Sequence, residues 1–238
     1  MSEESGQDEI QKPNALIKWL VGGLPLGLIV MGVLSFVIWF HKKKERAPIV
    51  SEFAAMLQKD VNTADFDRYV RIIAEEIGRS NMSEGEKGEA VATFVESSMS
   101  MDNMGYEMLR KGYENDGLAI YGELPGKNRS APPVVLVAQL QDAYKDRSRA
   151  NCLAAMMSVA HSLTGTQQTR TIRYAIVLGS EADQDMTHKA GGVIRLQGLE
   201  DQGLAGANEQ IYTVEDGRGN LLGMLQGLKQ SLETAASR

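Results

Sequence analysis

Two apolar runs that flank a helical pattern constrain the fold of this chain more than any other feature. Residues 133–138 are a nearly continuous apolar run, typical of a strand that is covered on both faces, and the largely apolar residues 171–178 are a second strong strand. A helical pattern at 152–163 lies between them. A strand, a crossover helix and a second strand indicate parallel pairing, because the crossover returns the chain to the end where the first strand began. We therefore predict an α/β domain with a mixed, mostly parallel central sheet flanked by helices.

Further elements are predicted on both sides of this crossover unit. Helical spacing begins near residue 52, and a second helix ends near residue 77 with Thr63 or Asp65 as its candidate cap. Ser83 and Glu86 fit a capping box at the start of a third helix, which runs towards residue 104. The other predicted elements are strands at 106–109, 118–121 and 192–196, a turn at 125–128 and a closing helix at 220–235.

The uncharged run at residues 19–40 indicates a membrane helix. At ~1.5 Å per residue it is about 33 Å long, enough for the ~30 Å hydrocarbon core. Trp19, Trp39 and Phe40 lie at its ends, where aromatic rings prefer the interface. A cleaved signal peptide has a shorter apolar core. We therefore predict a single-pass anchor in the cell (inner) membrane, a disordered acidic tail at 1–18, a basic juxtamembrane linker at 41–51 and one α/β domain at 52–238.

Small residues and composition restrict the partners. Gly23 and Gly27 form a GxxxG pair and Ser35 lies on the same row, so this face is expected to pack against other membrane helices. The formal net charge is −6, and no basic stripe is interleaved with aromatic residues, so no nucleic-acid partner is expected. Cys152 is the only cysteine, which excludes an internal disulfide and a zinc cage built from cysteines.

Four segments of the chain resemble the di-zinc aminopeptidase family, whose clan also holds glutaminyl cyclases and the transferrin-receptor ectodomain. The segments are LAIYGELPG at 118–126, VVLVAQLQ at 134–141, LAAMMSVAHSL at 153–163 and RTIRYAIVLGSE at 170–181. They follow one another in the family's order and spacing, and the similarity covers roughly residues 60–200. The resemblance implies a zinc-aminopeptidase-like fold that is truncated at its C-terminus.

The resemblance also implies where the metal site of such a protein would lie. The family binds two metal ions through His and carboxylate ligands and uses a nearby Glu as general base. The base position matches Glu181, whereas the ligand positions match Gln139, Ser148, Ala182 and Gln197, and Gln141 replaces an orienting Asp. A slip in the loop would bring Asp142 or Asp146 to the position of Ser148. Amides and hydroxyls bind zinc poorly, so neither a metal nor another cofactor is predicted.

Other residues of the chain could in principle form a replacement site. Glu181, Asp183, Asp185 and His188 form a predicted acidic loop after the second apolar strand, where α/β sheets place ligand sites. A solvated loop with ordinary surface charge is the simpler interpretation. His161 lies mid-helix and is expected to be packed or on the surface. Cys152 lies near a helix N-terminus, but no His–Asp or His–Asn pair that would make it a nucleophile is readable nearby.

These observations predict a non-catalytic pseudo-peptidase that acts as an accessory subunit of a larger membrane protein complex. Its expected partners are the lipid bilayer and other integral membrane proteins, which it would contact through the helix and the vestigial cleft. The alternatives are a membrane-bound metallohydrolase with a rearranged metal site and a receptor-like module that binds small peptides. Lysines at 42–44 favour a cytoplasmic domain, whereas anchored members of the family carry the domain outside. The outside, periplasmic in a bacterium, is slightly favoured.

Overall fold

A computed structural model describes residues 30–36, 56–198, 209–214 and 220–237. The chain divides into two compact units, residues 1–47 and 48–238. In the first unit, residues 30–36 are helical and their large apolar side chains are exposed.

The structure corrects the predicted membrane anchor. A membrane-spanning helix needs about 20 consecutive apolar residues, and within the described residues no helix is long and apolar enough to cross a membrane. The prediction that the protein resides in the cell membrane is therefore wrong on this finding. The rest of the 19–40 segment, including Gly23 and Gly27, lies outside the described residues, while Ser35 is exposed on the helical stretch.

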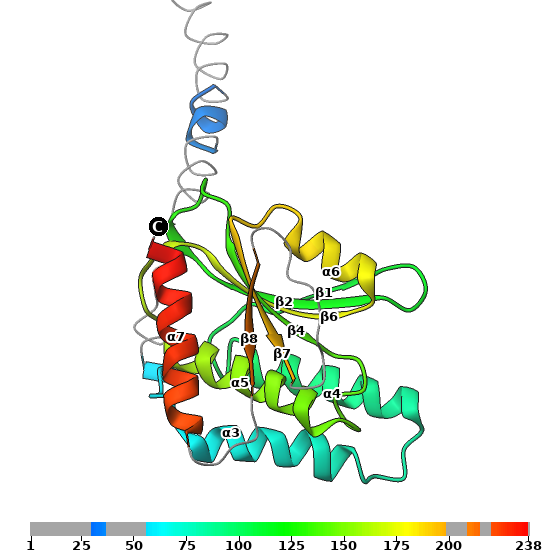
Figure 1. The fold of residues 1–238 in the computed structure, drawn as a ribbon. Coiled ribbons are helices and arrows are strands. Elements are labelled where there is room, and N and C mark those ends of the chain that lie inside the picture. Colours follow the sequence, from blue (N-terminus) through cyan, green and yellow to red (C-terminus); the bar gives the residue numbers. More distant parts are fainter. Residues whose placement is uncertain (1–29, 37–55, 199–208, 215–219, 238) are drawn as a thin grey trace, which may run out of the picture. The chain divides into compact units, whose positions relative to one another are not determined.

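The second unit is built on a six-stranded sheet (Figure 1). Its strands lie in the order β1-β2-β6-β4-β7-β8. Strands β6, β4, β7 and β8 run parallel to one another, whereas β2 pairs antiparallel with both β1 and β6. This arrangement confirms the predicted mixed, mostly parallel α/β sheet and the parallel crossover from β4 to β6. The strands are β1 (Leu109–Gly112), β2 (Leu118–Leu124), β6 (Ile172–Leu178), β4 (Val134–Gln139), β7 (Gly192–Gln197) and β8 (Glu209–Thr213).

Helices cover the two faces of the sheet unequally (Figure 1). One face carries α3 (Thr63–Val70), η1 (Arg71–Ile77), α4 (Glu84–Met99), α5 (Arg147–Leu163) and α7 (Leu221–Ser237). Among the described residues, the short α6 (Ser180–Thr187) alone covers the other. The core is divided accordingly. Leu136 and Ile176 face the large helical layer, whereas Val137 and Val177 face α6. We call the buried residues on that second side the α6 cluster: Ala119, Val135, Val137, Ala175, Val177, Ala182, Met186 and Val193.

Local capping explains where the predicted helices begin. Ser83 and Glu86 form the predicted capping box of α4, in which each side chain accepts from the other residue's backbone N–H. The second helix is capped by Asn62, not by Thr63 or Asp65, because the Asn62 side chain accepts from the Asp65 backbone N–H at 2.8 Å. Similarly, α5 begins five residues before the predicted start, because the Asp146 side chain accepts from the Ser148 backbone N–H.

Several predicted boundaries and elements are corrected. The first strand is Leu109–Gly112, not 106–109, because Tyr106 is buried against Tyr174 with 5.2 Å between ring centroids. The predicted turn at 125–128 contains strand β3 (Gly126–Asn128), which pairs in parallel with β5 (Gln168–Arg170). The third helix ends at Met99, several residues before the predicted end. Strands β3, β5 and β8 and helix α6 were not predicted.

Candidate functional site at the carboxyl edge of the sheet

The parallel strands bring three of the family-derived positions to one edge of the sheet. Gln139 is the last residue of β4 and Gln197 the last residue of β7, and both are half-buried. Glu181 follows the end of β6, in the first turn of α6, and is exposed. Strand β4 lies between β6 and β7, so the carboxyl ends of all three strands meet at this edge. Ligand sites of α/β sheets lie at this kind of edge.

The strand-to-helix turn after β6 determines which side chains of α6 reach the edge. Gly179 has φ 89°, a left-handed conformation that glycine adopts without strain, and α6 begins at the next residue. Ala182 then points at the sheet and is fully buried in the α6 cluster. The position that the resemblance assigns to a metal ligand therefore lies beneath the helix, among apolar side chains.

Ser148 and Gln141 also lack the surroundings of metal ligands. The Ser148 hydroxyl is buried without a hydrogen-bond partner, and a Cβ atom at Gly198 would overlap it. Gln141 is exposed, and its backbone carbonyl accepts from Arg149 Nη1 at 2.9 Å. Within the described residues, no group of three or more His, Cys, Asp or Glu side chains is arranged to hold a metal ion.

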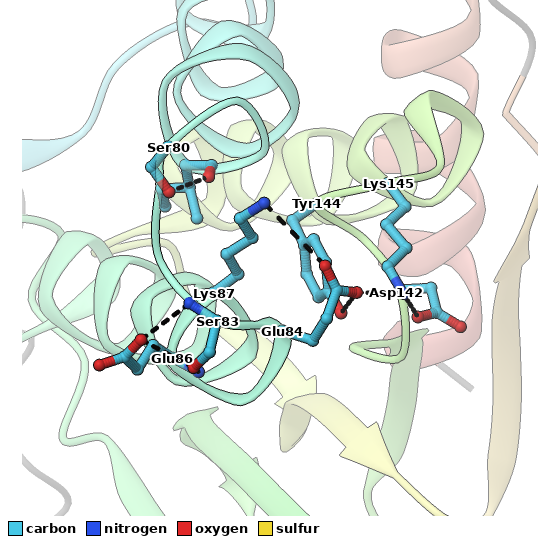
Figure 2. A network of polar contacts seen from close by, with 9 residues as sticks. Ser80, Ser83, Glu84, Glu86, Lys87, Asp142, Tyr144 and Lys145 are labelled. Carbon is cyan, nitrogen blue, oxygen red and sulfur yellow. Dashed lines mark hydrogen bonds and ion pairs between the residues drawn. The ribbon is translucent and has the colours of Figure 1, made fainter.

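The loop between β4 and α5 is held by a polar network at the start of α4 (Figure 2). The carboxylate of Glu84 accepts from the Tyr144 hydroxyl at 2.9 Å and pairs with the Lys145 ammonium. The hydrogen bond to Lys145 and the one to Tyr144 lower the pKa of Glu84. The same contact with Glu84 raises the pKa of Lys145. This loop is consequently anchored to α4, on the side of the sheet away from α6.

The two carboxylates considered as substitutes for Ser148 are engaged within this loop. Asp142 has φ 55° and lies 3.5 Å from the Lys145 ammonium. Asp146 caps α5 and lies 3.4 Å from Arg149 Nε. A positive φ at a residue other than glycine is uncommon, and here the network around Lys145 accompanies it. Neither carboxylate belongs to a metal-binding group within the described residues.

The predicted acidic loop is a helix, α6, and this separates its charged residues. Residues 181, 184, 185 and 188 share one side of the helix and line a pocket, as their spacing requires. Asp183 lies on a different side, where its carboxylate accepts from Arg195 Nη1 at 2.9 Å. A metal site that combines Glu181, Asp183 and His188 is therefore not formed, because the helical turn directs Asp183 towards β7.

The pocket beside α6 has a volume of ≈ 670 Å³ and is open to solvent. Its other wall is the end of β1 and the hairpin that follows: Lys111, Gly112, Tyr113 and Glu114. Asp185 joins the two walls, since its Oδ2 accepts from Lys111 Nζ at 2.8 Å and from the Tyr113 hydroxyl at 2.5 Å. The hydrogen bond from Lys111, with that from Tyr113, lowers the pKa of Asp185. The pKa of Tyr113 is raised, mainly by burial and next by the hydrogen bond to Asp185.

Sequence reasoning found the α6 side of this pocket and missed the hairpin side. Lys111 and Tyr113 are more than 70 positions from Asp185 in the chain, and nothing local connects them.

His161 and Cys152 both lie in α5, away from this pocket. His161, predicted to be packed or on the surface, is half-buried, its Nε2 lies 2.9 Å from the Leu57 carbonyl, and burial lowers its pKa. Cys152 is buried in α5.

Comparison with known proteins shows a partial similarity of fold. No family model and no curated protein matches the chain. Among solved structures, a leucine aminopeptidase precursor from Bacteroides thetaiotaomicron matches with 11% identity and a TM-score of 0.41 over 58% of this chain and 63% of that one. A Fimbriiglobus ruber glutaminyl cyclase matches with 11% identity and a TM-score of 0.39 over 59% of this chain and 62% of that one. A Zn-dependent exopeptidase from Parabacteroides distasonis matches with 11% identity and a TM-score of 0.40 over 58% of this chain and 62% of that one.

This chain thus spans less than two thirds of the length of each of these neighbours. The neighbours are enzymes, described as exopeptidases and glutaminyl cyclases. At these identities and TM-scores the similarity concerns the fold and carries no statement about activity. What it supports is that the α/β unit resembles Zn-dependent exopeptidase and glutaminyl cyclase folds.

Proposed function

We propose that the α/β unit is a non-catalytic, peptidase-like binding domain that serves as an accessory subunit of a protein complex. The observation that carries this proposal is the position of Ala182, which is fully buried in the α6 cluster where the resemblance expects a metal ligand. The flanking strand ends, Gln139 and Gln197, offer neutral amides, which are poor zinc ligands. Glu181 alone matches the chemistry of the family.

Ala182 differs from a simply substituted ligand, because its side chain is buried in the α6 cluster. A ligand lost by substitution alone would leave a small side chain facing the strand ends, and a single reversion would restore it. Here α6 turns the position towards Val137 and Val177 on the sheet. A glutamate at this place would bury a carboxylate among apolar side chains, which is strongly unfavourable without a paired cation or metal.

Metal content and hydrolysis test the non-catalytic part of the proposal. The full-length protein is incubated with zinc, desalted, and analysed for bound metal, then assayed on aminoacyl p-nitroanilides and on a peptide with N-terminal glutamine. We expect no stoichiometric zinc and no turnover above buffer, and the same result for Glu181→Gln. Stoichiometric zinc together with turnover that Glu181→Gln abolishes would contradict the proposal and support the metallohydrolase alternative.

The subunit part of the proposal is tested by native size. An extract of the source cells, with the chain at its natural abundance, is fractionated by sedimentation and the chain is followed with an antibody. We expect it to sediment in a particle larger than its own 26.0 kDa. Sedimentation as a free monomer under all extraction conditions would contradict the assignment as a subunit.

A further inference from the structure

Strand β1 has an open edge. Leu109, Arg110, Lys111 and Gly112 are all exposed, and within the described residues β1 pairs only with β2. Exposed edges are templates for strand addition, and many are blunted by charged side chains that stand over them. In β1 those charges are drawn away from the edge. Arg110 Nη1 donates to Glu89 of α4 at 2.7 Å, on one face, and Lys111 donates to Asp185 of α6, on the other.

The ladder between β1 and β2 shows which backbone groups face outwards. The Tyr113 backbone N–H donates to the Gly117 carbonyl at 2.8 Å and the Gly117 N–H donates to the Glu114 carbonyl, so Tyr113 and Glu114 together oppose Gly117 as in a β-bulge, at a hydrogen-bonded site of the ladder. Hydrogen-bonded and non-hydrogen-bonded pairs alternate along an antiparallel ladder. Lys111 therefore bonds to β2, whereas Gly112 and Arg110 direct their N–H and C=O groups to the open edge. A second strand can use both residues without disturbing the existing ladder.

The hairpin that carries this edge has a defined shape. Asn115 and Asp116 have φ 52° and 59°, and the Gly117 backbone N–H donates to the Glu114 carbonyl at 3.1 Å. Two positive φ values in succession are the signature of the tight hairpin turn whose twist matches the flanking strands. The hairpin lies beside α6 (Figure 1). The edge and the pocket are therefore held together by Lys111, Tyr113 and Asp185.

The pocket beside the edge favours a cation. Its lining holds three carboxylates, Glu114, Glu181 and Asp185, against the ammonium of Lys111 and the imidazole of His188. Lys111 and the Tyr113 hydroxyl both donate to Asp185, whereas within the described residues Glu114 and Glu181 have no ion-pair partner. Gly112 lines the pocket and also presents its backbone to the edge. Leu109 lies two residues before Lys111 on the same face of β1, and its side chain is 46% exposed.

We infer that the open edge of β1 and the adjoining pocket together bind one extended, cationic segment of a partner protein. The segment adds a strand to β1 through the outward backbone groups of Arg110 and Gly112. On the α6 side it places a lysine or arginine side chain in the pocket lined by Glu114 and Glu181, and an apolar side chain two residues away against Leu109. This inference rests on the proposed binding function and names the surface and the chemistry of the partner.

Amide exchange of the full-length protein tests the inference. The probe is a blocked hexapeptide of alternating threonine and valine with one central lysine, and its control carries glutamate in place of the lysine. At saturating lysine peptide we expect the exchange of the Arg110 and Gly112 amides to slow by about tenfold or more. The Lys111 amide, already bonded to β2, serves as the internal reference and should change little.

Two pairs of variants locate the binding. Gly112→Pro removes an outward N–H at a position where an edge strand tolerates proline, and should abolish binding. Gly112→Ala is its matched control, because a Cβ there meets no atom within 4 Å, and should bind as wild type. Glu114→Gln combined with Glu181→Gln should weaken the lysine peptide by roughly tenfold, as expected for the loss of charge-assisted contacts, and leave the glutamate peptide unchanged.

Three results would overturn the inference. These are no slowing of the Arg110 and Gly112 amides at millimolar lysine peptide, equal binding of both peptides, and a dimer of the chain in which these amides are already protected. The same samples are checked for bound zinc and for cleavage of the peptide. Cleavage with bound zinc contradicts the proposed function, whereas an intact and unbound peptide contradicts only this inference.

Discussion

Replacement of Ala182 by glutamate probes how α6 lies on the sheet. The side chain is fully buried and packs with Val137, Val177 and the rest of the α6 cluster. Adding atoms to a packed core costs about 1–3 kcal/mol. Burial that raises the pKa of a carboxyl by about 3 units costs about 4 kcal/mol at neutral pH. We expect Ala182→Glu to lower the free energy of unfolding by roughly 5 kcal/mol, a large part of the ~5–15 kcal/mol typical of a domain.

Ala182→Gln separates size from charge, because glutamine has nearly the same volume and cannot ionise. Both variants and the wild type are unfolded in urea and followed by circular dichroism at several pH values. A carboxyl whose pKa is higher in the folded state than in the unfolded state destabilises the protein only at pH values at which the unfolded state is ionised. The two variants should therefore be equally stable below pH ~4, and the glutamate variant should lose stability relative to glutamine as the pH rises above the unfolded pKa of ~4.3.

Two outcomes would refute this reasoning. One is a glutamate variant within about 0.5 kcal/mol of the wild type, the range of ordinary surface substitutions. The other is zinc that stabilises Ala182→Glu and not Ala182→Gln. Either result would mean that position 182 faces the strand ends, where a ligand set can converge.

Three further perturbations test the packing that supports the site. Tyr106→Phe removes a buried hydroxyl that donates to the Ala160 carbonyl at 2.6 Å, and should cost about 1 kcal/mol in urea unfolding. Burial raises the pKa of Tyr106 to about 12. In the wild type the stability that this phenol contributes should therefore be full below pH ~10 and be lost as the pH rises towards 12. Tyr106→Phe should not show this loss. Ser83→Ala breaks the capping box of α4 and should cost about 1 kcal/mol, whereas an unchanged midpoint would show that the box contributes nothing. Gly126→Ala places a Cβ onto the backbone of Arg170 and should destabilise by about 1–3 kcal/mol, while its control Gly88→Ala, in a helix with open space around the Cβ, should stabilise by up to about 1 kcal/mol.

Elements whose signal is local could be predicted well. The apolar runs of β4 and β6 are buried on both faces of the sheet, and the capping box of α4 forms between residues three positions apart. The membrane prediction used the same kind of local signal at residues 19–40, and it is contradicted within the described part of the chain. Helix α6 was missed because only Ala182 and Met186 of its eight residues are buried, and the rest are mostly polar.

The order of residues along the chain specifies the α/β class, the crossover from β4 through α5 to β6, and the residue types at the strand ends. Those types are the neutral amides of Gln139 and Gln197 and the carboxylate of Glu181. The directions of the α6 side chains depend on how that helix packs: Ala182 lies under the helix, Asp183 pairs with Arg195, and Glu181 lines the pocket. The physical reason is distance along the chain. The contacts of Lys111 and Tyr113 with Asp185, which join the two walls of that pocket, link segments some 70 residues apart, and no local pattern records such contacts.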